Sequence, residues 1–326
     1  MNRTNRWMIG LAVAVFMQCG HVSAAEVDSY PSKPPRLIVP YPPGGGSDIV
    51  ARQVADRLGT ILKQPFVVDN RGGGRGVPAN DAVAKAASDG YTLLLGTQAG
   101  LVINPLISTT KLPYDPIRDF APISMLYTSP MLLVVVNDLP VHSVKDLIAL
   151  AKKTPGKLNY ASAGIGAPNH IAGEMFKYMT GTDIVHVPYK GFAPAITDML
   201  GGQVQVKFNP VTALLPYVKS GKLRPIAVSA KERVGVLPEV PTIAESGVPG
   251  YVYELWYSLM APAKTPASII GTLNREIVKI LAEPETAQRF VGGDPRSSTP
   301  EALAKLIREE FDRTSKVVKA ANIKAD

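Results

Sequence analysis

The stretch VPYPPGGGSDIVARQVADRL, Val39–Leu58, joins the end of a hydrophobic strand to a helix through prolines and three consecutive glycines. Within it Val50, Val54 and Leu58 recur every four positions, which is typical of the buried face of a helix. A helix N-terminus exposes unpaired backbone N–H groups and carries a partial positive charge, so it attracts an anion. Glycine lets the anion approach the backbone, because no Cβ intervenes. The stretch therefore predicts a strand, an anion-binding loop and a helix.

A second stretch repeats this order: LNYASAGIGAPNHIAGEMFKYM, Leu158–Met179, runs from a strand through a glycine-containing loop into a helix. The apolar face predicted for that helix consists of Ile171, Ala172, Met175, Phe176 and Met179. The residues predicted to hold an anion are Gly44, Gly45, Gly46 and Ser47 in the first loop and Ser162, Gly164, Ile165, Gly166 and Ala167 in the second. Two such units, one in each half of the chain, suggest two facing lobes. For either loop alone, glycines that only permit a tight turn are the alternative.

Strand-like and helix-like segments alternate along the chain. The predicted strands are Arg36–Val39, Phe66–Asp69, Thr92–Gly96, Met131–Asn137, Leu158–Ser162, Val204–Asn209 and Leu223–Ser229, with amphipathic helices between most of them. This alternation predicts an α/β fold with largely parallel sheets.

Composition limits the possible functions. The 326 residues, 46% hydrophobic and 19% charged, suit a globular protein with room for two domains. Basic residues are scattered, with no run of four or more and no interleaved aromatic residues, which disfavours nucleic acid as a partner. The excess of basic residues instead suits a surface that modestly favours anionic ligands.

The N-terminus resembles a secretory signal. Arg3 and Arg6 precede an apolar run, Met8–Met17, that is too short to span a bilayer, and Val22–Ala24 has the small-residue pattern of a cleavage site. Residues 1–24 are therefore predicted to be a signal peptide, cleaved near Ala24, and the mature protein to be periplasmic. Removing both arginines and no acid lowers the formal charge from +8 to +6.

The single cysteine, Cys19, lies inside the predicted signal. Lipid attachment there is an alternative, but Gln18 stands where a small residue is normally needed. The mature chain is expected to contain no disulfide and no cysteine-ligated metal.

Phosphate-binding loops fit the glycines poorly. Nucleotide hydrolases need a lysine and a Ser or Thr after their glycines, whereas Gly46 is followed by Ser-Asp-Ile. Neither loop has the three-glycine spacing of dinucleotide-binding proteins. No cofactor is therefore predicted, and a carboxylate is the anion that suits a glycine loop without a lysine.

Candidate catalytic residues are few. His142, His170 and His186 do not stand at metal-ligand spacing on one helix, so no metal site is predicted. Ser162 faintly resembles a nucleophile elbow, although Tyr160 occupies the position of the leading glycine. A secreted hydrolase with Ser162 and a histidine base is thus the alternative from another functional class, and an interaction or sensor protein of the same fold is a third.

These residues together carry a family resemblance. The chain resembles the extracytoplasmic solute receptors of tripartite tricarboxylate transporters, also called the Bordetella uptake gene (Bug) family. The matching stretches follow one another from about Pro34 to the C-terminus: IVPYPPGGGSDIVAR, VVDNRGGGRG, DGYTLLLGT, YASAGIGAPNHIAGEMF, HVPYKG, VPTIAESGVPGY and WYSLMAPAKTP.

The resemblance implies a two-lobed periplasmic binding protein of the Venus flytrap type, with no enzymatic turnover. Lobe one is predicted to comprise residues 26–128 plus 251–326 and lobe two 129–250, with crossings near Met131–Asn137 and Tyr251–Met260. It implies a ligand carboxylate held by backbone groups of the first loop and, through waters, by the second. The implied ligand-binding residues are Pro43, Gly44, Gly45, Gly46, Ser47, Asp48, Thr97, Gln98, Ser162, Ala163, Gly164, Gly166 and Ala167. The expected partners are a small carboxylate and an inner-membrane tripartite tricarboxylate permease, and the expected state is a monomer.

The chain departs from the family pattern at several positions. Arg75 replaces a small residue, and Ala167 stands where a serine is common. In GGQVQVKFNP the family commonly has aspartates at the positions of Gln205 and Asn209 and an apolar residue at Lys207. Strand alternation sends Gln205, Lys207 and Asn209 to one face. We therefore include Lys207 and Asn209 among the ligand-binding candidates and expect a di- or tricarboxylate, aliphatic or aromatic, rather than an amino acid.

Overall fold

The computed structural model describes residues 30–289 and 293–325, of which Pro31 onward form one compact unit. The predicted signal peptide, its cleavage near Ala24 and Cys19 lie outside the described residues. Among the described helices, none is both long and apolar enough to cross a membrane.

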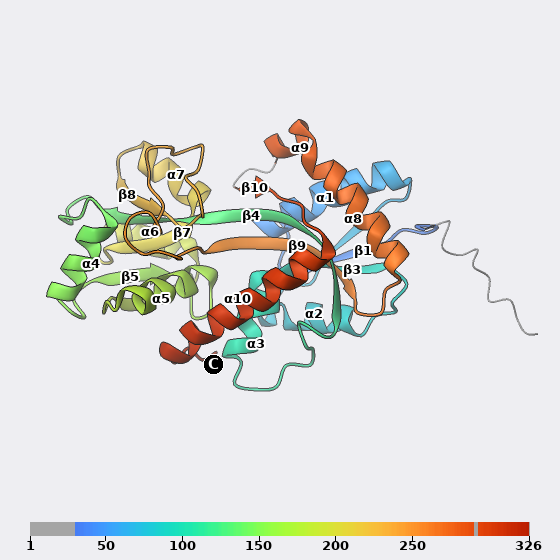
Figure 1. Cartoon of the computed structure of the whole chain (residues 1–326), viewed down its shortest axis with the longest axis horizontal. Helices are drawn as coiled ribbons and strands as arrows, with labels where there is room; N and C mark the ends of the chain where they lie inside the picture. The colour runs from blue at the N-terminus through green and yellow to red at the C-terminus, as the bar shows by residue number, and fades with distance from the viewer. Residues whose placement is uncertain (1–29, 290–292, 326) are drawn as a thin grey trace, which may run out of the picture. The chain divides into compact units, whose positions relative to one another are not determined.

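Helices and strands alternate through the compact unit (Figure 1), as the sequence predicts. The first part of the chain forms β1 (Arg36–Val39), α1 (Gly46–Leu62), β2 (Val67–Asn70), the 3₁₀ turn η2 (Gly74–Gly76), α2 (Val77–Ala84), β3 (Thr92–Thr97), the π-helical turn η3 (Ala99–Ile103), α3 (Asn104–Ile107) and β4 (Phe120–Val136). The middle part forms α4 (Val144–Lys153), β5 (Asn159–Ser162), α5 (Pro168–Thr180), β6 (Val185–Pro188), α6 (Phe192–Leu200), β7 (Val206–Pro210), α7 (Val211–Lys219) and β8 (Leu223–Val228). The last part forms β9 (Glu254–Pro262), α8 (Ala267–Ala282), α9 (Pro284–Arg289), β10 (Asp294–Pro295) and α10 (Pro300–Ala320).

The strands form one path, β2-β1-β3-β9-β4-β7-β5-β6, which consists of two half-sheets. In the first half-sheet β1 lies parallel to both β2 and β3, and β9 runs antiparallel between β3 and β4. In the second, β5 lies parallel to β6 and β7, and β7 and β8 run antiparallel to β4. The strands β1, β2 and β3 are therefore parallel to one another, as are β5, β6 and β7. The strands β9 and β4, which lie between these two groups, pair antiparallel with their neighbours.

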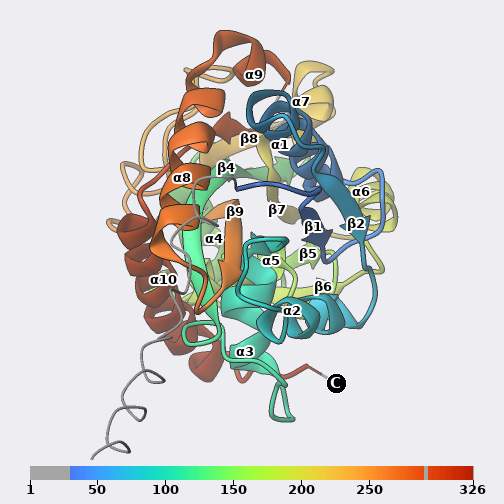
Figure 2. The same cartoon turned by 90° about the vertical axis from the view of Figure 1, so that its right-hand side faces the viewer.

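The long strand β4 connects the two half-sheets. Its first part, Phe120–Pro130, pairs with β9, and its last part, Met131–Val136, pairs with β7 and β8. Figure 1 shows β4 and β9 side by side through the centre, with α1, α8 and β1 toward one end and α4, α5 and β5 toward the other. Figure 2 shows α1 and α8 on one side of the first half-sheet and α2 on the other.

The hydrophobic core is continuous across the two half-sheets. One buried cluster contains Ile103 and Ile107 of the first half, Phe176 and Phe208 of the second, and Val317 of α10. The helix α10 packs against both β4 and α5, so the C-terminal helix stabilises both halves. The lobe boundaries at 128/129 and 250/251 stay a prediction, since this shared core marks no border between them.

Burial largely follows the predicted periodicity. Val50, Val54 and Leu58 of α1 are buried, as are the first four apolar residues predicted for α5. The fifth, Met179, is 36% exposed and lies in the last turn of α5.

Candidate functional site

The first glycine loop, Pro43–Asp48, connects β1 to α1. Gly45 is the N-cap of α1 in an extended conformation (φ −85°, ψ 171°), and no side chain caps the helix. The first backbone bond of the helix runs from the N–H of Ile49 to the carbonyl of Gly45, at 3.0 Å. The N–H groups of Gly45, Gly46, Ser47 and Asp48 have no hydrogen-bond partner within the described part of the chain. Four donors at a positive helix end can therefore bind an anion.

The Asp48 side chain shapes this loop. Its Oδ2 accepts hydrogen bonds from the Gly44 N–H at 2.9 Å and from Arg52 Nε at 3.0 Å. Burial alone would raise the pKa of Asp48, but the hydrogen bonds from Arg52 and Gly44 hold it below its usual value. Gly44 has φ +88°, a conformation that glycine adopts without strain. The charged side chain of Asp48 thus fixes the turn. Asp48 can therefore contribute to an anion site only through its backbone N–H.

Thr97 lies beside the first loop, whereas the side chain of Gln98 points elsewhere. A Cβ on Gly46 would lie 3.7 Å from the hydroxyl of Tyr257, and Tyr257 pairs with Thr97 between β9 and β3. Gln98 instead donates from Nε2 to Glu310 on α10 at 2.7 Å and is almost completely buried. The amide of Gln98 therefore anchors α10.

The second glycine loop, Ser162–Ala167, connects β5 to α5 and forms hydrogen bonds within itself. The N–H of Ala163 donates to Asn169 Oδ1 at 3.1 Å, and the N–H of Gly164 donates to Ser162 Oγ at 3.1 Å. The N–H of Ala167 donates to the carbonyl of Gly164 at 3.2 Å. These donors already have partners, unlike those of the first loop.

Gly166 is held by a histidine. Its N–H donates to Nδ1 of His170 at 3.0 Å, so His170 carries its ring proton on Nε2. Burial, followed by the charge of Lys177, lowers the pKa of His170 to about 4. At neutral pH the ring is uncharged and keeps Nδ1 free to accept this bond.

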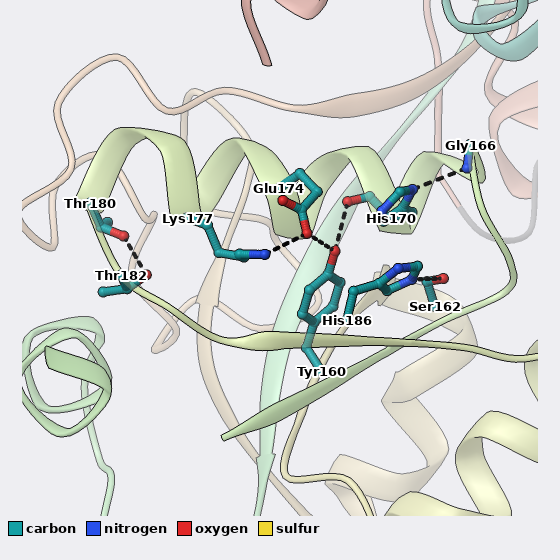
Figure 3. A network of polar contacts seen from close by, with 9 residues as sticks. All are labelled: Tyr160, Ser162, Gly166, His170, Glu174, Lys177, Thr180, Thr182 and His186. Atoms are coloured by element: carbon teal, nitrogen blue, oxygen red, sulfur yellow. Dashed lines mark hydrogen bonds and ion pairs between the residues drawn. The ribbon is translucent and has the colours of Figure 1, made fainter. Parts of the chain in front are cut away.

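Ser162 and His186 form the tightest contact of the loop (Figure 3). Ser162 Oγ lies 2.6 Å from His186 Nε2, and the His186 ring stacks on His170 at 3.8 Å and on Tyr160 at 5.0 Å between ring centroids. Burial, followed by the charge of His170, lowers the pKa of His186 to about 3. The structure does bring Ser162 and a histidine base together, but Ser162 is completely buried and its hydroxyl also bonds Gly164. The Ser162 hydroxyl therefore bonds to His186 and to both backbone groups of Gly164, and it holds the loop.

A buried polar chain extends this support along α5. The hydroxyl of Tyr160 donates to Glu174 Oε1 at 2.6 Å, and Lys177 Nζ donates to the same oxygen at 2.8 Å. Figure 3 shows Glu174 between Lys177 and Tyr160, with His170 and His186 next in line toward Gly166. The chain fixes α5 on β5 and so fixes the loop between them.

The second loop also contacts the first half of the chain. Gly166 has φ +76°, and a Cβ there would lie 2.3 Å from Cδ1 of Ile107 on α3. This contact brings the second loop against the segment that follows β3, whose last residue, Thr97, borders the first loop. Both loops follow the carboxyl ends of parallel strands, where α/β proteins generally bind ligands.

Asn209 and Lys207 lie on β7. Asn209 Oδ1 accepts from Asn169 Nδ2 at 2.9 Å, and Asn169 in turn accepts from the Ala163 N–H, so Asn209 supports the second loop. Lys207 is completely buried, and its Nζ has no hydrogen-bond partner among the described residues. The predicted residues lie in the two loops or on strands beside them, except that the Gln98 side chain is directed to α10; ligand binding by these residues stays a prediction. The supporting roles of Asn169, His186 and Tyr160 were not predicted from the sequence, although YASAGIGAPNH and HVPYKG contain all three.

Metal binding has no support from the described residues, which contain no group of three His, Cys, Asp or Glu side chains arranged to hold an ion.

Comparison with known proteins identifies relatives along nearly the whole chain. Residues 50–323 match the family described as "Tripartite tricarboxylate transporter family receptor". The chain is 37% identical over 319 residues to Protein BugT of Bordetella pertussis, covering 97% of each chain. It is 38% identical to the solved structure of R. palustris Rpa4515 with adipate, with a TM-score of 0.76 over 90% of this chain and 99% of the other. It is 30% identical to MatC from Rhodopseudomonas palustris with bound malate, with a TM-score of 0.71 over 89% of this chain and all of the other.

Proposed function

This chain belongs to the tripartite tricarboxylate transporter receptor family, and on that basis we propose that it captures a small organic carboxylate on its first glycine loop for uptake. The protein is a periplasmic solute-binding receptor with the two-lobed α/β fold of its relatives, and it is not an enzyme. Ser162 has a structural role in the second loop, since its hydroxyl bonds to His186 and Gly164.

The start of α1 carries the proposal. Four successive N–H groups there have no partner among the described residues, and two of the four residues that carry them are glycines. A carboxylate that docks on them gains charge-assisted hydrogen bonds without breaking any bond within the loop. The two related structures whose names include adipate and malate hold dicarboxylic acids, which supports the same ligand class for this chain.

The second glycine loop is proposed to form the opposite wall of the site. Its N–H groups at Gly164 and Ala167 bond within the loop, and those at Ala163 and Gly166 bond to side chains of α5, so its contribution is a preformed shape, its carbonyl oxygens and bridging water. A wall held by buried hydrogen bonds loses little conformational entropy when a ligand binds.

A thermal-shift screen of the mature protein against organic acids tests the proposal. We expect malate, adipate or a related acid to raise the melting temperature, and mass spectrometry to recover that acid chemically intact after overnight incubation. No shift with any acid would refute carboxylate capture.

The variant Gly45→Asp localises the site. An aspartate at the N-cap accepts from the N–H of Ser47 or Asp48, and no atom lies within 4 Å of the new Cβ. The variant should fold normally and lose its response to carboxylates, because its own carboxylate occupies the donors. Gly235→Asp, which adds the same charge to an exposed loop with equal space, is the control and should keep the response. Unchanged binding by Gly45→Asp would place the ligand elsewhere.

Delivery to an inner-membrane permease, a monomeric state and cleavage near Ala24 complete the proposed function. A pull-down from solubilised membranes, with and without adipate, tests the first. Light scattering of the purified protein and mass spectrometry of its N-terminus test the others.

A further inference from the structure

Lys207 places a positive charge inside the second half of the chain. It is completely buried on β7, and its Nζ has no hydrogen-bond acceptor among the described residues. Burying an unpaired charge is unfavourable, so lysine is rarely found fully buried without a partner. Burial lowers the pKa of Lys207 to about 8, which leaves the ammonium group charged at pH 7. A buried ammonium group without an acceptor among the described residues is suited to binding the anionic group of a ligand.

The start of α6 adds backbone donors beside this lysine. The helix has nine residues, its N-cap is Gly191 at φ 112°, and no side chain caps it. The N–H groups of Phe192 and Ala193 have no hydrogen-bond partner among the described residues, and Pro194 has no N–H. Nζ of Lys207 lies 5.6 Å from the ring centroid of Phe192, the first residue of the helix. Lys207 therefore makes a cation–π contact with the first side chain of α6, the helix whose N-terminus carries a partial positive charge.

This position adjoins the second glycine loop. Lys207 pairs with Ala161 on β5, the residue directly before that loop. The connection from β6 to α6 also touches the loop: the N–H of Tyr189 donates to the carbonyl of Ser162 at 3.1 Å, and a Cβ on Gly164 would lie 3.4 Å from the Tyr189 carbonyl. Asp198 on α6 is the acidic residue closest to Lys207 in the sequence. Its carboxylate already accepts a hydrogen bond from the Tyr189 hydroxyl at 2.8 Å.

We infer that Lys207 and the N-terminus of α6 form a second anion subsite, which binds the distal carboxylate of a dicarboxylic acid whose first carboxylate docks on the first glycine loop. The inference rests on the proposed function and narrows it to a class of ligand. A monocarboxylate of equal length fills only the first position and leaves Lys207 unpaired. An amino acid would bring an ammonium group toward a buried cation, so the subsite discriminates against it.

Titration calorimetry with matched acids tests the inference. The ligands are the dicarboxylates succinate, glutarate and adipate, each paired with the monocarboxylate of equal carbon number: butanoate, pentanoate and hexanoate. The proteins are the wild type, Lys207→Met and Lys219→Met, of which the last removes an exposed lysine from α7 as a control. Methionine has nearly the length of lysine and no charge, so it keeps the packing against Phe192.

At least one dicarboxylate should bind the wild type tenfold or more tightly than its matched monocarboxylate. Lys207→Met should weaken that dicarboxylate tenfold or more and change the monocarboxylate by less than twofold, while Lys219→Met changes neither. Equal losses for both acids would overturn the inference and leave the first-loop site standing. Equal binding of both members of every pair by the wild type would also overturn the inference, and this test does not depend on the folding of a variant. Binding of no acid at all would overturn the proposed function, and the inference with it.

Discussion

Replacing Lys207 by methionine should stabilise the protein when no ligand is added. The ammonium group of Lys207 is buried without an acceptor among the described residues, and burial lowers its pKa from 10.5 to about 8. One pH unit corresponds to about 1.4 kcal/mol, so the buried charge lowers the free energy of unfolding by about 3 kcal/mol at pH 7. Methionine fills the same space beside Phe192 without this charge. The melting temperature should therefore rise by roughly 5 °C or more.

The pH dependence separates this effect from improved packing. The unfolded chain releases the lysine proton near pH 10.5 and the folded chain near pH 8, so between these values the unfolded state binds more protons. The unfolding free energy of the wild type therefore rises with pH across this window, and the destabilisation is complete below pH 8. The difference between Lys207→Met and the wild type should shrink from about 3 kcal/mol at pH 7 toward zero by pH 10.5.

Urea unfolding, followed by circular dichroism at pH 7, 8, 9 and 10, measures that difference directly. Lys219→Met, on the exposed face of α7, is the matched control and should have the stability of the wild type throughout. A Lys207→Met variant that is less stable than the wild type at pH 7 would show that the buried charge does not destabilise the fold. An equal difference in stability at pH 7 and pH 10 would show that the effect does not come from the lysine charge.

Three further predictions concern the second glycine loop. Gly166→Ala places a residue with a Cβ at φ +76°, and that Cβ would lie 2.3 Å from Cδ1 of Ile107. Thermal unfolding should therefore show a free energy of unfolding lower by about 1–3 kcal/mol. The pKa of His170 is lowered to about 4, so the stability that His170 contributes is complete above pH 6.5 and is lost as the pH falls toward 4. His170→Asn keeps an acceptor for the Gly166 N–H, and its unfolding free energy, measured in urea at pH 7 and 4.5, should fall less between these pH values than that of the wild type. Ser162→Ala removes buried hydrogen bonds and should lower the unfolding free energy by about 1–3 kcal/mol, with the bound acid recovered intact from both proteins by mass spectrometry.

The sequence specifies the strand–loop–helix units well, because local periodicity decides them. The predicted strand Arg36–Val39 has the bounds of β1, and Val50, Val54 and Leu58 are buried in α1. The prediction of largely parallel sheets holds only within each group of strands. The first part of β4, Phe120–Pro130, and its antiparallel partner β9 are paired across more than a hundred residues of chain, and local patterns do not contain that pairing.

The free N–H groups of the first loop could be predicted from the sequence, whereas the hydrogen bonding of the N–H groups in the second loop could not. Free N–H groups at a glycine-rich helix start follow from the local sequence, because the N-cap residue Gly45 has no side chain that could accept hydrogen bonds from them. Whether the N–H groups of the second loop are free depends on side chains that the fold brings to it, such as His170, which accepts from Gly166. Gln98 is the extreme case, since its partner Glu310 lies 212 positions away.

The contrast between the loops separates affinity from selectivity. A carboxylate gains hydrogen bonds from the first loop without breaking bonds of the protein, whereas the N–H groups of Gly164 and Gly166 would first have to leave Ser162 and His170. In the proposed binding mode, affinity for carboxylates in general comes mainly from the start of α1. In the same binding mode, selectivity among carboxylates comes from Lys207, whose Nζ has no hydrogen-bond partner among the described residues. Substitutions in the first loop should then weaken the binding of all carboxylates by a similar factor. Substitutions of Lys207 should instead change the order of the affinities of different carboxylates.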